Sequence, residues 1–158
     1  MADPLAVYLQ DHLAGAKFAI SLLEDLSAQT PDSNVARFSA ELLAQVEVDR
    51  SALQELVERI AGDTSTLKEA AAWVAQKAGR FKLTLNEPLG TFEAIEMLCL
   101  GVQGKLALWN ALHAVRESDN RLDRLNLDEL ISRAITQHEQ LEDVRLQLAR
   151  SVFATRNK

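Results

Sequence analysis

The chain has 158 residues, of which 47% are hydrophobic and 25% charged, and we expect residues 1–158 to form a single domain with its own core. Only 6 glycines and 3 prolines are present, so the turn residues that sheets require are scarce and long helices are favoured. The formal net charge is -6, with basic residues scattered among acidic ones. No basic stripe can follow a phosphate backbone, which argues against nucleic acid as a partner.

The first two predicted helices form a hairpin. Asp3 and Pro4 combine a capping acceptor with a backbone angle that is preset for a helix start. Apolar residues then recur at helical spacing as far as the short connection at residues 30 and 31. The second helix starts near Asp32 or Ser33 and ends at Gly62. Because the connection is so short, the two helices must be antiparallel.

The next segment is the longest predicted connection. Thr66, with Glu69 three residues later, is a capping-box pattern that opens a short helix, and Gly79 closes it. Polar and apolar residues alternate from 80 to 85, but no other segment could pair with a strand here, so an extended loop is predicted. We expect three apolar residues to anchor this loop: Phe81, Leu83 and Leu85.

The last two long helices form a second hairpin. The third long helix begins between positions 88 and 91 and runs to about Val115, and a polar stretch follows it. Asn126, with Glu129 three residues later, is a second capping signal. The fourth long helix then continues to near Phe153. The connections are therefore short, long and short, which leaves the second and third long helices parallel.

This organisation resembles the ferritin-like superfamily, whose four-helix bundles join two antiparallel helical hairpins by a long crossover. Metal-binding members carry a Glu on each of two helices and a Glu-x-x-His motif on each of the other two. The nearest carboxylate runs here begin at Glu47 and Glu139, and neither has a His at the required spacing. The resemblance thus implies the fold and, since such dimers are common, a homodimer, without the usual ligand set.

Polar residues interrupt the apolar stripes at one level of the predicted bundle. His12 lies in the stripe of the first helix, and Asp49 in that of the second. Facing residues of the first hairpin have numbers that sum to about 61, which places His12 opposite Asp49. The same reasoning places Lys105 opposite His138 and near the height of Asp49. We therefore predict a core polar layer of His12, Asp49, Lys105 and His138.

Two functional hypotheses follow from this layer. In the first, the protein is a non-enzymatic ferritin-like bundle with a degenerate metal site: Lys105 occupies the place of the cations, pairs with Asp49, and no cofactor is expected. In the second, the chain is a di-metal-binding protein or oxidoreductase that holds Fe, Mn or Zn through His and carboxylate ligands in the bundle core. Its candidate ligands are His12, Asp49, Glu96, His138 and Glu142. A third hypothesis, a small hydrophobic ligand between the helices, requires a cavity.

Other features favour a non-enzymatic cytoplasmic protein. The single cysteine, Cys99, lies in an apolar run and suits a reducing compartment. No secretory signal is recognisable, and charged residues interrupt the most apolar stretch, so no membrane partner is expected. Catalytic triads, phosphate-binding loops and zinc spacings are not recognisable. The large residues are predicted to fill the core: Phe38, Trp73, Phe92, Met97 and Trp109.

Overall fold

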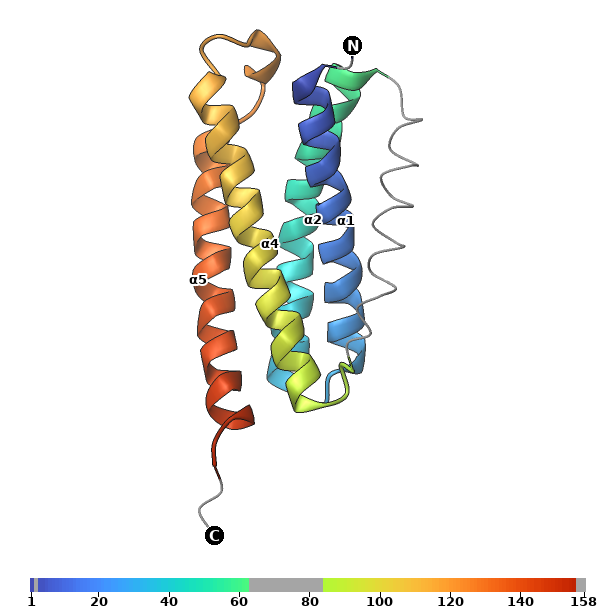
Figure 1. Ribbon diagram of the computed structural model, residues 1–158, viewed down its shortest axis with the longest axis vertical. Coiled ribbons are helices and arrows are strands. Elements are labelled where there is room, and N and C mark those ends of the chain that lie inside the picture. Colours follow the sequence, from blue (N-terminus) through green and yellow to red (C-terminus); the bar gives the residue numbers. More distant parts are fainter. Residues whose placement is uncertain (2, 63–83, 156–158) are drawn as a thin grey trace.

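The computed structural model describes residues 1, 3–62 and 84–155, and this part of the chain is helical without any strand (Figure 1). A short 3-10 helix, η1, precedes the last long helix. The described helices are α1 (Pro4–Gln29), α2 (Ser33–Ala61), α4 (Pro88–Val115), η1 (Asn120–Leu122) and α5 (Leu127–Val152). The all-α prediction is therefore confirmed for these residues. The predicted short helix at 66–79 and the loop anchors Phe81 and Leu83 lie outside them.

The helix ends follow the capping signals in the sequence. The Asp3 carboxylate accepts a hydrogen bond from the Leu5 amide at 2.9 Å. Asp32 caps α2 in the same way, and the Asn126 side chain accepts from the Glu129 amide at 3.2 Å. At the end of α2, Gly62 adopts the left-handed conformation (φ 64°). Local side-chain chemistry thus sets the boundaries of three of the long helices.

The helices pair two and two. α1 packs along α2, and α4 packs along α5. The hairpins meet mainly through α1 and α4, whereas α2 and α5 make few contacts. Figure 1 shows that α2 and α4 run in the same direction, with the end of α2 and the start of α4 at opposite ends of the bundle. None of the described helices is both long and apolar enough to cross a membrane.

The apolar core consists of two clusters, one toward each end of the bundle. The first cluster includes Leu22, Leu26, Leu42, Ile95, Leu98 and Leu141. The second cluster includes Leu9, Leu13, Leu56, Trp109, Leu112 and Leu130. Each cluster draws on all four long helices. Of the predicted core fillers, Trp109 and Phe92 are buried and Phe38 and Met97 are half-buried, while Trp73 lies outside the described residues.

A tight junction joins the end of α1 to the start of α4. The Thr91 hydroxyl donates to the carbonyl of the buried Leu85 at 3.0 Å and lies 3.1 Å from the Thr30 hydroxyl. Gly90 lies directly against the Thr84 backbone, because a Cβ atom added at Gly90 would come within 2.0 Å of the Thr84 carbonyl oxygen. This junction positions α4 against α1, and hence one hairpin against the other.

The junction yields a stability prediction with a control on the same helix. Gly90→Ala is expected to destabilise the protein by about 2 kcal/mol, since the new methyl group must displace backbone. Gly101→Ala has no described atom within 4 Å of its new Cβ and should stabilise α4 by about 0.5–1 kcal/mol. Urea denaturation of both variants measures the difference. Equal stabilities would contradict the tight contact at Gly90.

Candidate functional site

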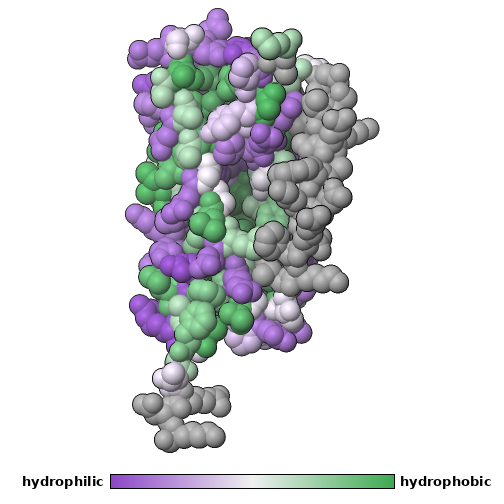
Figure 2. Space-filling view, viewed as in Figure 1, coloured by the Kyte–Doolittle hydropathy of each residue, from purple (hydrophilic) through white to green (hydrophobic). Residues whose placement is uncertain are grey.

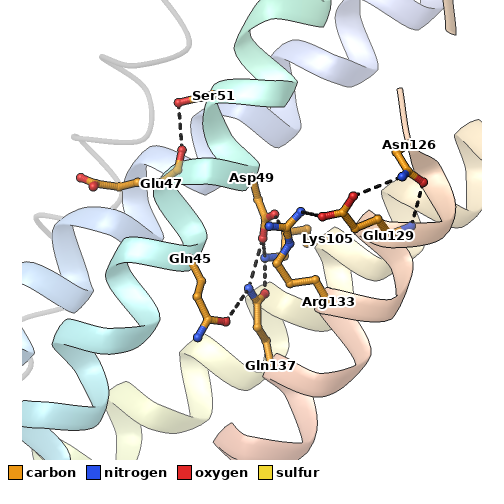
Figure 3. A network of polar contacts seen from close by, with 9 residues as sticks. All are labelled: Gln45, Glu47, Asp49, Ser51, Lys105, Asn126, Glu129, Arg133 and Gln137. Atoms are coloured by element: carbon orange, nitrogen blue, oxygen red, sulfur yellow. Dashed lines mark hydrogen bonds and ion pairs between the residues drawn. The ribbon is translucent and has the colours of Figure 1, made fainter. Parts of the chain in front are cut away.

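Asp49 is the buried centre of a polar network midway along the bundle (Figure 3). It lies on α2 between the core residues Val46 and Leu53, and only 2% of its surface is exposed. The Lys105 ammonium reaches it from α4 and donates to Asp49 Oδ2 at 2.7 Å. The structure therefore contains the Lys105–Asp49 ion pair that the helix register predicts. A carboxylate at this depth requires such a partner, because an unpaired buried charge is very costly.

Gln137 of α5 is the second partner of the pair. Its Oε1 accepts a hydrogen bond from the Lys105 ammonium, while its Nε2 donates to Asp49 Oδ2 at 3.2 Å and to Gln45 Oε1 at 3.3 Å. The side chain is fully buried. The structure thus places Gln137 where His138 was predicted, and His138 is only half-buried. Adjacent residues on a helix point about 100° apart. An error of one residue in the predicted register of α5 therefore places His138 where Gln137 lies.

Arg133 of α5 is the third partner, and sequence reasoning missed it. Its Nε lies 3.0 Å from Asp49 Oδ1, an ion pair whose geometry falls short of a hydrogen bond. The same guanidinium lies 3.4 Å from the exposed Glu129 carboxylate. Arg133 precedes Gln137 by four residues, so both side chains lie on one face of α5. The four-residue spacing could have identified Arg133, because a buried carboxylate commonly needs more than one donor and Arg133 lies on the same face as Gln137.

The network contains one buried carboxylate and two cations. Burial lowers the pKa of the Lys105 ammonium, and the adjacent Asp49 carboxylate opposes this effect. Lys105 keeps 15% of its side-chain surface exposed, and Arg133 keeps 27%. Counting Asp49, Lys105 and Arg133 alone, the buried layer therefore carries a net charge of +1, which the exposed Glu129 only partly offsets.

His12 lies apart from this hydrogen-bond network. The half-buried ring packs edge-on against Tyr8, with the ring centroids 4.7 Å apart. His12, Asp49 and Lys105 nevertheless line one cavity between α1, α2 and α4. Burial lowers the pKa of the imidazole from its usual 6.5, and the Asp11 carboxylate opposes this only in part. His12 is therefore a neutral group facing the same space as the Asp49–Lys105 pair.

Two other candidate ligands, Glu96 and Glu142, belong to a separate cluster. Both pair with Arg145, whose Nη1 lies 3.1 Å from Glu96 and whose Nε lies 2.7 Å from Glu142. The guanidinium holds the pKa of the Glu142 carboxyl below its usual range. Cys99 is buried beside them, and burial raises the pKa of its thiol to about 11. Such a thiol is protonated and unreactive at neutral pH.

The five candidate metal ligands thus do not form one cluster. Among the described residues, no group of three or more His, Cys, Asp or Glu side chains is arranged to hold a metal ion. What the structure brings together at the centre of the bundle is a carboxylate, an amide, an ammonium and a guanidinium. This set can form hydrogen bonds and ion pairs without a metal.

The charge balance around Asp49 predicts an order of stability. Asp49→Leu leaves Lys105 and Arg133 facing each other without an anion and should cost about 3–5 kcal/mol. Lys105→Met leaves Asp49 with Arg133 and Gln137 and should cost about 2 kcal/mol. Arg116→Met removes an exposed ion pair with Asp128 and should change stability by less than about 0.5 kcal/mol. Urea denaturation at pH 7 measures all three, and an unchanged midpoint for Lys105→Met would contradict the pairing.

The position of His12 predicts a pH dependence of stability. The unfolded chain takes up a proton at about pH 6.5, whereas burial delays this uptake in the folded protein. The unfolded state therefore holds more protons in this window, so the contribution of His12 to stability falls as the pH falls below about 7. Denaturation at pH 7.5 and 5.5 should show a smaller loss for His12→Asn than for the parent. The same loss in both would show that His12 is not linked to folding.

Comparison with protein-family models, with characterised proteins and with solved structures finds no match to this chain.

Proposed function

We propose that this chain is a non-enzymatic, ferritin-like four-helix bundle in which a buried charge cluster stands in place of a metal centre. One observation carries the proposal: the Lys105 ammonium lies between Asp49 and Gln137 at the midpoint of the core, 2.7 Å from the carboxylate. The network lies between the two apolar clusters of the core. Metal-binding bundles of this kind also place their ligands inside the core, on side chains of facing helices.

The charges of the cluster support this proposal. A divalent cation at this level requires several anionic or neutral ligands, and within residues 1, 3–62 and 84–155 Asp49 is the only carboxylate in direct contact with Lys105. Lys105 and Arg133 already supply two positive charges to it. A metal ion would have to displace Lys105 from its hydrogen bonds and overcome repulsion from Arg133. The cluster therefore favours a core held together by its own cations.

The finer topology belongs to the same proposal. We propose that residues 63–83 form the long crossover of a ferritin-like bundle and contain the short helix predicted from Thr66 to Gly79. The parallel directions of α2 and α4 support this arrangement (Figure 1). A cytoplasmic location and a homodimer are the corresponding expectations. Analytical ultracentrifugation at micromolar concentration distinguishes the dimer from the monomer.

Metal reconstitution tests the proposal. The protein, purified without a histidine tag, is incubated with Fe²⁺, Mn²⁺ or Zn²⁺, desalted and analysed for metal content. We expect far less than one ion per chain, because Lys105 already neutralises the carboxylate that a metal would need. The Lys105→Ala variant serves as a comparison, since it removes the competing cation and leaves Asp49 in place.

The opposite outcome favours the di-metal alternative. One or more ions per chain in the parent protein, lost in a variant that combines His12→Asn with Asp49→Asn, would overturn the proposal. Retention of the metal in that variant would instead place the ion elsewhere on the chain. Circular dichroism establishes that each variant is folded before its metal content is compared.

A further inference from the structure

An elongated cavity of about 560 Å³ lies between α1, α2 and α4. Its lining on α1 extends from Asp11 to Leu23, a span of about 18 Å at the helical rise of 1.5 Å per residue. The volume lies within the range of small-molecule sites, about 300–1,000 Å³. Figure 2 shows a hollow near the middle of the face viewed in Figure 1, with hydrophobic surface inside it.

The two ends of the cavity differ in chemistry. Toward the start of α1 and the end of α4, its lining includes His12, Asp49, Lys105 and Trp109. Toward the end of α1 and the start of α4, the lining is apolar and includes Phe18, Leu22, Leu42, Met97, Leu98 and Val102. The cavity is therefore amphipathic along its length, with a polar end and an apolar compartment.

Glycines open the cavity rather than permit close packing. Gly15 of α1 and both Gly101 and Gly104 of α4 line it. A Cβ atom added at any of the three would have no neighbouring atom within 4 Å in the described part of the chain. Glycine inside a helix costs about 0.5–1 kcal/mol relative to alanine, and among the described residues no tight contact compensates for that cost. Gly15 and Gly101 are exposed and Gly104 is half-buried, so the three glycines lie on the accessible part of the lining, where larger side chains would narrow the cavity.

The polar end presents hydrogen-bond donors. The Lys105 ammonium has three N–H groups, and the described residues accept from two of them. The Trp109 indole N–H is buried and has no hydrogen-bond partner among the described residues. His12 adds an imidazole N–H at the same end. Asp11 and Arg50 also line this end; the formal charges of Asp11, Asp49, Arg50 and Lys105 sum to zero, so this end offers an excess of hydrogen-bond donors without an excess of charge.

We propose that this cavity binds one medium-chain fatty acid, with its carboxylate at Lys105 and Trp109 and its acyl chain along the apolar compartment. A carboxylate accepts from several donors and would accept from the third Lys105 N–H and the buried Trp109 N–H, which have no acceptor among the described residues. A single acyl chain suits a narrow space about as long as twelve helical residues. Burying the acyl chain against the apolar lining removes hydrophobic surface from water, which favours binding. This binding role goes beyond the proposed non-enzymatic bundle and does not depend on whether a metal binds.

Titration calorimetry with the delipidated full chain tests the ligand class. We expect dodecanoate to bind one molecule per chain, at least tenfold more tightly than dodecanol of the same chain length. Dodecyltrimethylammonium, which reverses the head-group charge, should bind more weakly still. Absence of dodecanoate binding to the folded protein would overturn the proposal. Equal affinities for the three compounds would overturn the assignment of the carboxylate to Lys105.

Substitutions test the location of the site. Gly101→Leu projects a side chain into the open space and should weaken dodecanoate binding at least tenfold, whereas Ala111→Leu, an exposed residue outside the cavity on the same helix, should leave it unchanged. Trp109→Phe keeps the ring but removes the N–H and should weaken binding about three- to tenfold. Ala16→Leu narrows the cavity from α1 and replaces Gly101→Leu if that variant does not fold. Unchanged affinity in a folded Gly101→Leu or Ala16→Leu variant would place the ligand elsewhere and overturn the proposal.

Discussion

The buried carboxylate of Asp49 is the constraint on which the arrangement of the two hairpins depends. It faces the interior from α2, and its partners come from the other hairpin: Lys105 on α4, and Arg133 and Gln137 on α5. A shift of one helical turn, about 5.4 Å, between the hairpins would leave this charge without partners. Apolar clusters alone tolerate sliding much better, because hydrophobic contacts are not directional. The polar network therefore specifies the register in which the two clusters of the core are formed.

The same network explains why long side chains span the middle of the bundle. α2 and α5 make few contacts, so a direct apolar seam between them is weak. Arg133 and Gln137 bridge this separation, and Gln45 extends the bridge from the α2 side. On the opposite side of Asp49, between α1 and α4, glycines and alanines line the cavity instead. Among the described residues, polar side chains thus close the core on one side of Asp49, and a cavity adjoins it on the other.

Sequence reasoning recovered the helices and the central ion pair because both depend on local or regular features. Side-chain caps mark the starts of α1, α2 and α5, and the helical rise together with a short connection determines which residues face each other. The prediction for α5 was less accurate: the sequence indicated His138, but Gln137 holds the position. The connection that contains η1 sets the rotation of α5, and this rotation cannot be read from residue spacing.

Arg133 was missed because a basic residue followed by polar neighbours resembles a solvated helix face, although the need of Asp49 for further donors was a signal. The cavity was also beyond prediction, since glycine in a helical pattern indicates a weak helix and not the space beside it.

Lys105 connects the stability of the bundle to the chemistry of the cavity. One of its three N–H groups donates to Asp49 and another donates to Gln137, which satisfies the hydrogen bonds of the buried network. Because the N–H groups of an ammonium diverge, the third points away from these two acceptors. A purely structural ion pair would need no adjoining cavity, and the three glycines that line it meet no atom of the described residues that would compensate for weakening their helices. A ligand carboxylate at this place would accept from the third Lys105 N–H and from the buried Trp109 N–H. Structural and binding roles are therefore compatible in the same side chain, because the contacts that hold Lys105 in place also orient its remaining donor.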